Sequence, residues 1–271
     1  MKGILTSSAI LILLLMIGCA DEVVTPSDGE GEIRMHLIDA PTDAEEVVVV
    51  VNRVEVHAAG SDETSGWVVV NDQPASYDLL ELRNGASAIF GNATLAAGRY
   101  TQIRLILGAG SYIKIGGLQF NLEVASGFQT GVKLTHTFEI VDGGIYELYL
   151  DFDAERSIVL TGTGQYRMSP VIRCQSKVVS GDVAGTVLPA DANASIWTTA
   201  GSDTVMTTAA ADGSFKLMAL PEGTYTLTIE TSNAAYLGTT VPGVVVTKGQ
   251  TTNVGTITLQ GVAQGKALET Q

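Results

Sequence analysis

Three aspartates are the residues in this sequence best suited to bind a metal ion. Asp151 and Asp153 lie two positions apart in an alternating stretch, so a strand there would place both carboxylates on one face, and Asp39 could meet them from a loop. Calcium prefers such hard oxygen ligands, so the three form a candidate calcium site. The alternative is structural: Asp39 caps a turn, and the other two pair with Arg104 or Arg156 or face solvent.

The other reactive side chains form no recognisable catalytic set. His36, His57 and His136 lie far apart in the sequence and do not have the spacing of metal-binding motifs. The sequence contains no G-x-S-x-G elbow and no phosphate loop. Cys174 has no neighbouring His or Cys to lower the pKa of its thiol, so we expect it to be buried and inert. We therefore expect a protein that is not an enzyme.

The second cysteine, Cys19, follows an N-terminal apolar stretch. Lys2 precedes an unbroken apolar run over residues 9–17, which is the anatomy of a signal peptide and is shorter than the roughly 20 residues that cross a bilayer. Met16-Ile17-Gly18-Cys19 resembles the lipobox of bacterial lipoproteins, with Met where Leu is usual. The resemblance implies cleavage after residue 18 and acylation of Cys19 with more than one chain, which anchors a protein firmly.

The composition is typical of a well-packed, acidic β protein. Of the 271 residues, 45% are hydrophobic, 16% are charged and 30 are glycine, which argues against a disordered chain. The formal net charge of −14 disfavours nucleic acid as a partner.

The pattern of apolar residues predicts an all-β fold with two consecutive β-sandwich domains. We expect five segments along the chain: a signal peptide at 1–18, the acylated cysteine and an acidic tether at 19–31, a first sandwich at 32–175, a second sandwich at 178–260, and a disordered tail at 261–271. Acidic residues directly after Cys19 also resemble surface-export signals of some lipoproteins, the alternative being a solvated linker.

Several local features of these domains can be predicted. The valine run at 47–51 should form a central buried strand, and Ser76 should cap a helical turn that ends near Leu82. The Asp142-Gly143-Gly144 sequence predicts a hairpin, after which Leu148, Leu150 and Phe152 face the core. Tyr100 and Tyr225 follow similar glycine corners, where a buried ring with its hydroxyl on backbone would pin the turn.

Residues 31–174 resemble domain of unknown function 4382 (DUF4382), a family of prokaryotic secreted and lipid-anchored proteins. The resemblance implies an envelope β domain and brings no known activity. It is carried, in order, by Leu37-Ile38-Asp39-Ala40-Pro41, Gly66-Trp67, Tyr77-Asp78-Leu79-Leu80-Glu81-Leu82, Gly98-Arg99-Tyr100-Thr101-Gln102-Ile103-Arg104-Leu105, Ser126-Gly127, Leu150-Asp151-Phe152-Asp153-Ala154, Arg156-Ser157-Ile158-Val159 and Ser169-Pro170-Val171-Ile172-Arg173.

The second unit resembles carboxypeptidase-regulatory-like, or transthyretin-like, sandwich domains. Gly213-Ser214-Phe215, Leu220-Pro221-Glu222-Gly223-Thr224-Tyr225 and Val254-Gly255-Thr256-Ile257-Thr258-Leu259 carry this resemblance. Such modules usually serve as spacers or binding platforms. Some relatives with this carbohydrate-binding-like fold bind glycans, which makes Trp197 a candidate stacking platform, although a core position would also explain it.

The sequence as a whole predicts a non-enzymatic, lipid-anchored protein of the bacterial cell envelope, favouring the outer membrane, with a structural, adhesive or ligand-binding role. Its expected partners are the membrane, through the acylated Cys19, and a glycan or an envelope or extracellular protein. No cofactor is expected unless calcium binds. The alternatives are a carbohydrate-binding surface lipoprotein and a calcium-dependent hydrolase built on Asp39, Asp151 and Asp153.

Overall fold

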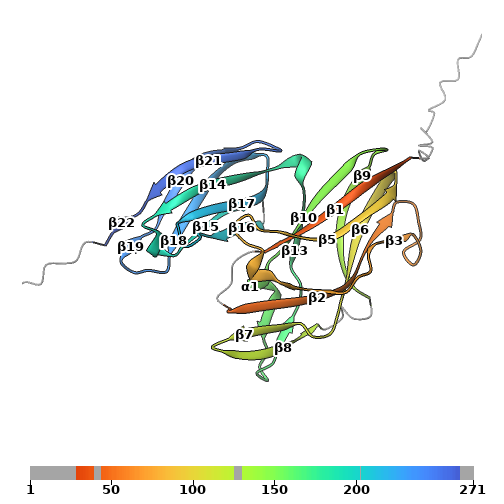
Figure 1. Ribbon diagram of the computed structural model, residues 1–271, viewed down its shortest axis with the longest axis horizontal. Helices are drawn as coiled ribbons and strands as arrows, with labels where there is room; N and C mark the ends of the chain where they lie inside the picture. The colour runs from red at the N-terminus through yellow and green to blue at the C-terminus, as the bar shows by residue number, and fades with distance from the viewer. Residues whose placement is uncertain (1–28, 40–43, 125–129, 202, 263–271) are drawn as a thin grey trace, which may run out of the picture.

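The computed structural model describes residues 29–39, 44–124, 130–201 and 203–262, which form two β-sandwich-like domains (Figure 1). The predicted all-β fold class is therefore confirmed. The signal peptide, Cys19, most of the tether, Pro41, the Ser126-Gly127 landmark and residues 263–271 lie outside the described residues. Within the described part, no helix has the length and apolarity needed to cross a membrane.

The first domain packs two sheets against each other. Sheet A has the order β13 (Ile172–Ser176), β10 (Ile145–Phe152), β1 (Glu30–Asp39), β5 (Ala88–Ala96). Sheet B runs β11 (Ile158–Leu160), β12 (Tyr166–Met168), β8 (Leu118–Val124), β7 (Tyr112–Ile115), β2 (Glu46–Ala58), β6 (Gly98–Leu107), β9 (Val132–Ile140), and β3 (Trp67–Asn71) and β4 (Ala75–Asp78) also pair with β2. The short helix α1 (Ala154–Ser157) follows β10.

The second domain also has two main sheets. One has the order β17 (Ser214–Pro221), β14 (Ser180–Leu188), β21 (Thr251–Thr258), and the other β16 (Asp203–Thr208), β15 (Ala194–Ala200), β18 (Gly223–Thr231), β20 (Thr239–Val246). A small ribbon pairs β19 (Tyr236–Leu237) with β22 (Gln260–Gly261). Three single turns of 3-10 helix complete the described structure: η1 (Leu79–Glu81), η2 (Lys177–Val179) and η3 (Ala190–Ala192).

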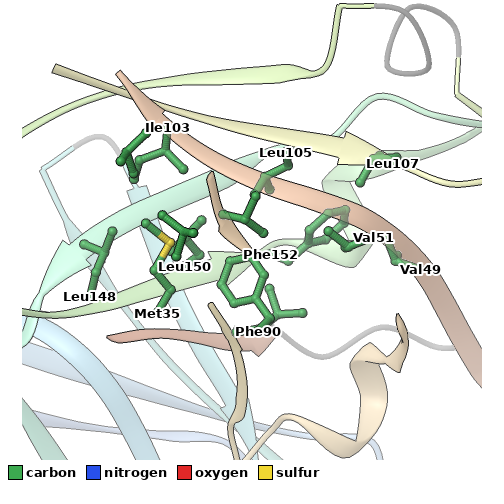
Figure 2. Close-up of a cluster of buried hydrophobic side chains, with 14 of the residues drawn as sticks. Met35, Val49, Val51, Phe90, Ile103, Leu105, Leu107, Leu148, Leu150 and Phe152 are labelled. Carbon is green, nitrogen blue, oxygen red and sulfur yellow. The ribbon is translucent and has the colours of Figure 1, made fainter. Parts of the chain in front are cut away.

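Strand alternation builds the core of the first domain (Figure 2). Leu148, Leu150 and Phe152 of β10 are 0%, 0% and 2% exposed, as predicted from their two-residue period. They meet side chains of sheet B such as Ile103 and Leu105. The valine run is central, but it is not buried throughout: alternate residues face the core, while Val48 and Val50 between them are half-buried. A strand with one face on the core needs only every second residue to be buried.

Two local predictions are wrong in instructive ways. The Asp142 turn exists, but β9 and β10 on either side of it belong to different sheets and do not pair, so the turn makes an arch between the layers of the sandwich. The stretch at 75–78 is strand β4, and the cap of the following 3-10 turn is Asp78, whose Oδ1 accepts from Leu80 N at 3.1 Å. The expected cap, Ser76, lies within the strand.

Both glycine corners are pinned by a tyrosine hydroxyl, as predicted, although the ring is buried only at Tyr100 and half-buried at Tyr225. Tyr100 donates its hydroxyl to Ala96 O at 3.0 Å, and Tyr225 donates to Pro221 O at 2.8 Å. In each case the acceptor lies four residues earlier, across the corner that enters the strand. A hydroxyl bond of this kind ties the corner to the strand while the ring fills apolar space. The two domains therefore use the same device to start β6 and β18.

Candidate functional site

The three candidate metal-binding aspartates lie together where the first domain meets the second. β1 and β10 are parallel, with Ile38 opposite Asp151 and Asp39 opposite Phe152, so both carboxylates stand at the same ends of adjacent strands. Asp153 follows directly after β10. The structure therefore brings Asp39, Asp151 and Asp153 into one neighbourhood.

Asp39 is a buried carboxyl group with one unused oxygen. The residue is 5% exposed, and its Oδ1 accepts from Ala154 N at 3.2 Å, while its buried Oδ2 has no hydrogen-bond partner. Burial raises the pKa of Asp39 well above its usual value, and the nearby Asp151 raises it further, whereas the bond from Ala154 acts in the opposite direction. Burial therefore shifts Asp39 toward its neutral, protonated form relative to an exposed aspartate.

The other two aspartates are engaged by arginines. Asp151 Oδ2 accepts from Arg173 Nη2 at 2.9 Å and from Nε at 3.3 Å, yet burial still raises the pKa of Asp151. Asp153 caps α1 by accepting from Arg156 N at 2.9 Å, and its other oxygen lies 3.8 Å from the Arg156 guanidinium. Arg156 is thus a partner of Asp153, as the structural alternative expects.

Calcium binding at this cluster stays a prediction. Among the described residues, no three His, Cys, Asp or Glu side chains are grouped so that they could hold a metal ion. A cation here would have to compete with Arg173 for Asp151 and would need ionised Asp39, whose pKa is raised.

Arg104, the other arginine considered for these aspartates, lies elsewhere. It forms an ion pair with Glu55 of β2, which is 5% exposed, and its Nε donates to Glu55 Oε2 at 2.6 Å. Its guanidinium also lies 4.0 Å from the centre of the Trp67 ring, a cation–π contact on the outer face of sheet B.

The domain junction is held by residues that the sequence did not single out. Asn84 takes a left-handed conformation with φ of 54°, in a loop that follows η1. Its backbone N donates to Thr207 Oγ1 at 3.1 Å, its Nδ2 donates to Ser214 O at 3.3 Å, and its Oδ1 accepts from Lys216 N at 2.6 Å. Asn84 of the first domain is therefore hydrogen-bonded to two strands of the second, to β16 through its backbone and to β17 through its side chain.

Arg173 makes a second connection across the junction. While it holds Asp151, its Nη1 donates to Ala219 O at 2.8 Å in the second domain. Beside it, Ile38 and Tyr149 of the first domain form a small apolar cluster with Ala219, which is fully buried. The junction therefore combines charge-assisted hydrogen bonds with apolar contact.

A groove of about 480 Å³ opens between β9 and β13, the edge strands of sheets B and A. The rings of Phe138 and Tyr146 stack in it at 5.0 Å, and His136 Nε2 lies 3.2 Å from the Tyr146 hydroxyl. Burial lowers the pKa of His136 and raises the pKa of the Cys174 thiol to about 12. The lining of the groove is largely apolar. Cys174 is half-buried in it, not buried as predicted, and its raised pKa keeps the thiol protonated at neutral pH.

Trp197 lies in β15, an inner strand of its sheet, opposite Met206 of β16 and Thr228 of β18. Its neighbours Ile196 and Thr198 are buried, whereas Trp197 itself is half-buried and points to the other face of the sheet. The ring is thus partly accessible, and sugar stacking on it stays a prediction.

Comparisons with known structures find two pilins and a cohesin–X-dockerin complex, all at low similarity. The shaft pilin SpaA from Lactobacillus rhamnosus GG is 9% identical over 89% of this chain and 100% of its own, with a TM-score of 0.29. The minor pilin GBS52 from Streptococcus agalactiae is 12% identical over 86% of this chain and 98% of its own, with a TM-score of 0.27. A chain of a type II cohesin–X-dockerin complex from Acetivibrio cellulolyticus is 21% identical, with a TM-score of 0.24. The match covers 30% of this chain and 58% of that chain. Similarity at this level says nothing about function.

The family comparison is decisive for the first domain. The model of the domain of unknown function (DUF4382) matches residues 30–170, and that of the carboxypeptidase regulatory-like domain matches residues 178–260. No curated protein was found to match the chain. Because the first match alone covers more than half of the 271 residues, the chain belongs to the DUF4382 family and carries a carboxypeptidase regulatory-like domain after the family's own domain.

Proposed function

We propose that this protein is a non-enzymatic structural module of the bacterial cell envelope, anchored by lipid at Cys19, in which two β-sandwiches act as one rigid spacer. The observation that carries the proposal is the domain junction, where Asn84 and Arg173 of the first domain are hydrogen-bonded to the second domain. Domains that merely follow one another along a chain are expected to move independently unless their interface holds them.

The connection between the domains has little slack. β13 ends at Ser176 and β14 begins at Ser180, so η2 is the whole linker. The Ser176 hydroxyl accepts from Val178 N at 3.3 Å, and the Ser180 hydroxyl donates to Ser176 O at 2.9 Å. A flexible spacer needs a longer, solvated segment, whereas this linker is hydrogen-bonded to itself.

The charged groups that a catalytic centre would need are already engaged in structural contacts at the junction. Asp151 is hydrogen-bonded to Arg173, Asp153 caps α1, and burial raises the pKa of Asp39. Such an arrangement supports a mechanical role more than the hydrolase alternative, which requires free carboxylates around a metal.

The anchor is tested by replacing the acylated residue. Cys19→Ala should abolish incorporation of radiolabelled palmitate and release the chain from the membrane fraction, while Cys174→Ala serves as the control that keeps both. Continued labelling of Cys19→Ala would contradict the anchor. Protease treatment of intact cells then tests display, since a surface protein is degraded and a periplasmic one survives.

Glycan binding is a second candidate, favoured by the half-buried Trp197 on the outward face of its sheet. Stacking of a sugar ring needs an aromatic face and no particular polar group. On a glycan array, Trp197→Ala should lose binding and Trp197→Phe should keep most of it. Equal signals from both variants would argue against this site.

A further inference from the structure

The edge of sheet B at β9 is open. Among the described residues, β6 is the one strand that pairs with β9, so within each regular stretch of β9, 132–135 and 138–140, alternate residues turn their backbone N–H and C=O away from the sheet. Exposed edges of this length invite another strand, and natural proteins usually block them with proline, short strands or cover. β9 has nine residues, contains no proline and carries one charge near each end, Lys133 and Glu139.

The sequence of β9 is complementary to itself when read in opposite directions about His136. An antiparallel pair of identical strands centred there would place charge opposite opposite charge, threonine opposite threonine, and apolar opposite apolar. The resulting pairs are Val132 with Ile140, Lys133 with Glu139, Leu134 with Phe138, and Thr135 with Thr137.

The faces of the strand agree with this register. Lys133, Thr135, Thr137 and Glu139 are exposed on the outer face, so both members of each polar pair would lie on the solvent side. Leu134 and His136 are half-buried on the inner face, beside the buried Phe138. In the described structure neither Lys133 nor Glu139 has an ion pair, although Lys133 Nζ lies 5.8 Å from the Trp67 ring.

We propose that two copies of this chain associate through antiparallel pairing of their β9 strands about a two-fold axis at His136. The groove between β9 and β13 adjoins this edge, so the second copy's inner-face residues would cover it and reach Val178 and Val179, which are 62% and 52% exposed in a single chain. The groove is thus incomplete without the second copy, which adds apolar burial to the backbone hydrogen bonds of the new strand pair.

The local shape of β9 favours an identical partner over an arbitrary peptide. The register between β6 and β9 shifts between Tyr100 and Gln102, opposite His136 and Thr137, while the side chains of β9 keep their alternation. Such irregularities increase strand twist and discourage pairing with a flat strand. A second copy carries the same local twist, which a flat peptide strand lacks. The axis at His136 places the irregularity at His136 and Thr137 of one copy beside His136 and Thr135 of the other.

A charge swap tests the register. The full-length chain is examined by sedimentation equilibrium in density-matched detergent at physiological salt, because the net charge of −14 opposes association when it is unscreened. Lys133→Glu and Glu139→Lys should each raise the dimer dissociation constant about tenfold, since each creates two like-charge pairs. The double swap Lys133→Glu/Glu139→Lys should return it to within about twofold of the original.

Cysteine pairing gives an independent readout in cells. Differently tagged full-length chains carrying Lys133→Cys and Glu139→Cys, in a Cys174→Ala background, should form a covalent heterodimer on oxidation when they are produced together. The shifted pair of Thr135→Cys with Glu139→Cys is the matched control and should stay uncrosslinked. A chain that is monomeric at every concentration, single reversals that leave association unchanged, or equal crosslinking of matched and shifted pairs would each overturn the proposal.

Discussion

Replacing Asn84 by alanine should uncouple the two domains without unfolding either one. The substitution removes two side-chain hydrogen bonds across the junction, to Ser214 O and from Lys216 N. Each is worth about 0.5–1.5 kcal/mol. It also places alanine at a φ of 54°, a left-handed conformation that asparagine tolerates but that costs alanine about 1 kcal/mol. We expect Asn84→Ala to weaken the junction by about 2–4 kcal/mol.

Two matched variants separate these contributions. Asn84→Gly removes the same side-chain bonds but accepts a positive φ freely, so it should lose about 1 kcal/mol less than Asn84→Ala. Asn84→Asp keeps an acceptor for Lys216 N but replaces the donor to Ser214 O with an oxygen that the carbonyl repels, so it should be no milder than Asn84→Gly.

The readout is the distance between the domains. Spin labels on Gln119→Cys in the first domain and Lys248→Cys in the second, both exposed positions, report this distance in a full-length Cys19→Ala background. The wild-type junction should give one narrow distance distribution and a single calorimetric transition. Asn84→Ala should broaden the distance distribution and split the calorimetric transition into two. An equally narrow distribution and an unchanged melting profile in Asn84→Ala would refute the rigid-spacer reasoning.

Three further predictions concern buried ionisable groups. Glu55→Gln leaves the Arg104 guanidinium without its carboxylate and should cost about 2 kcal/mol in urea unfolding, below the usual 3–5 because the Arg104 side chain is 22% exposed to water. Because burial raises the folded-state pKa of Asp39 above the unfolded value, stability should fall as pH rises through the range between them; Asp39→Asn should remove this slope, so an unchanged slope in the variant would contradict the assignment. The half-buried Cys174, whose pKa is raised to about 12, is only about one part in ten thousand thiolate at pH 8 and should label slowly with iodoacetamide until the chain is unfolded in urea; fast labelling of the native chain would contradict the raised pKa.

The sequence was sufficient for those features that depend on neighbouring residues alone. A two-residue period decides which face of a strand is buried, and this is why Leu148, Leu150 and Phe152 could be assigned to the core. The tyrosine corners were predictable for the same reason, since the hydroxyls of Tyr100 and Tyr225 reach a carbonyl only four residues away.

Features that depend on distant parts of the chain could not be read in the same way. Turn residues such as Asp142 indicate that the chain reverses direction. They do not indicate whether the two flanking strands pair with each other or belong to different sheets. The proximity of Asp39 to Asp151 was predicted correctly. The ion-pair partner of Asp151 was not, because Arg173 comes from the edge strand β13.

The junction itself left only a weak trace in the sequence. Asn84-Gly85 is an ordinary turn signal, and nothing in its composition says that its amide will bond to β17, which lies 130 residues further along the chain. Interfaces between domains depend on the complementarity of two finished surfaces, so they become visible only when both domains have been folded.

The placement of the first strand has a consequence for how the protein folds. β1 lies between β5 and a parallel partner, β10, whose register pairs Glu32 with Ile145, and β14 of the second domain likewise pairs in parallel with the late strand β21. Folding is slow when loops of this size must close, because the chain loses entropy before the distant contacts form that offset the loss. When the chain emerges with its N-terminus first, more than a hundred further residues must follow before β10 can pair with β1. Until then that edge of β1 is unpaired and needs protection from aggregation.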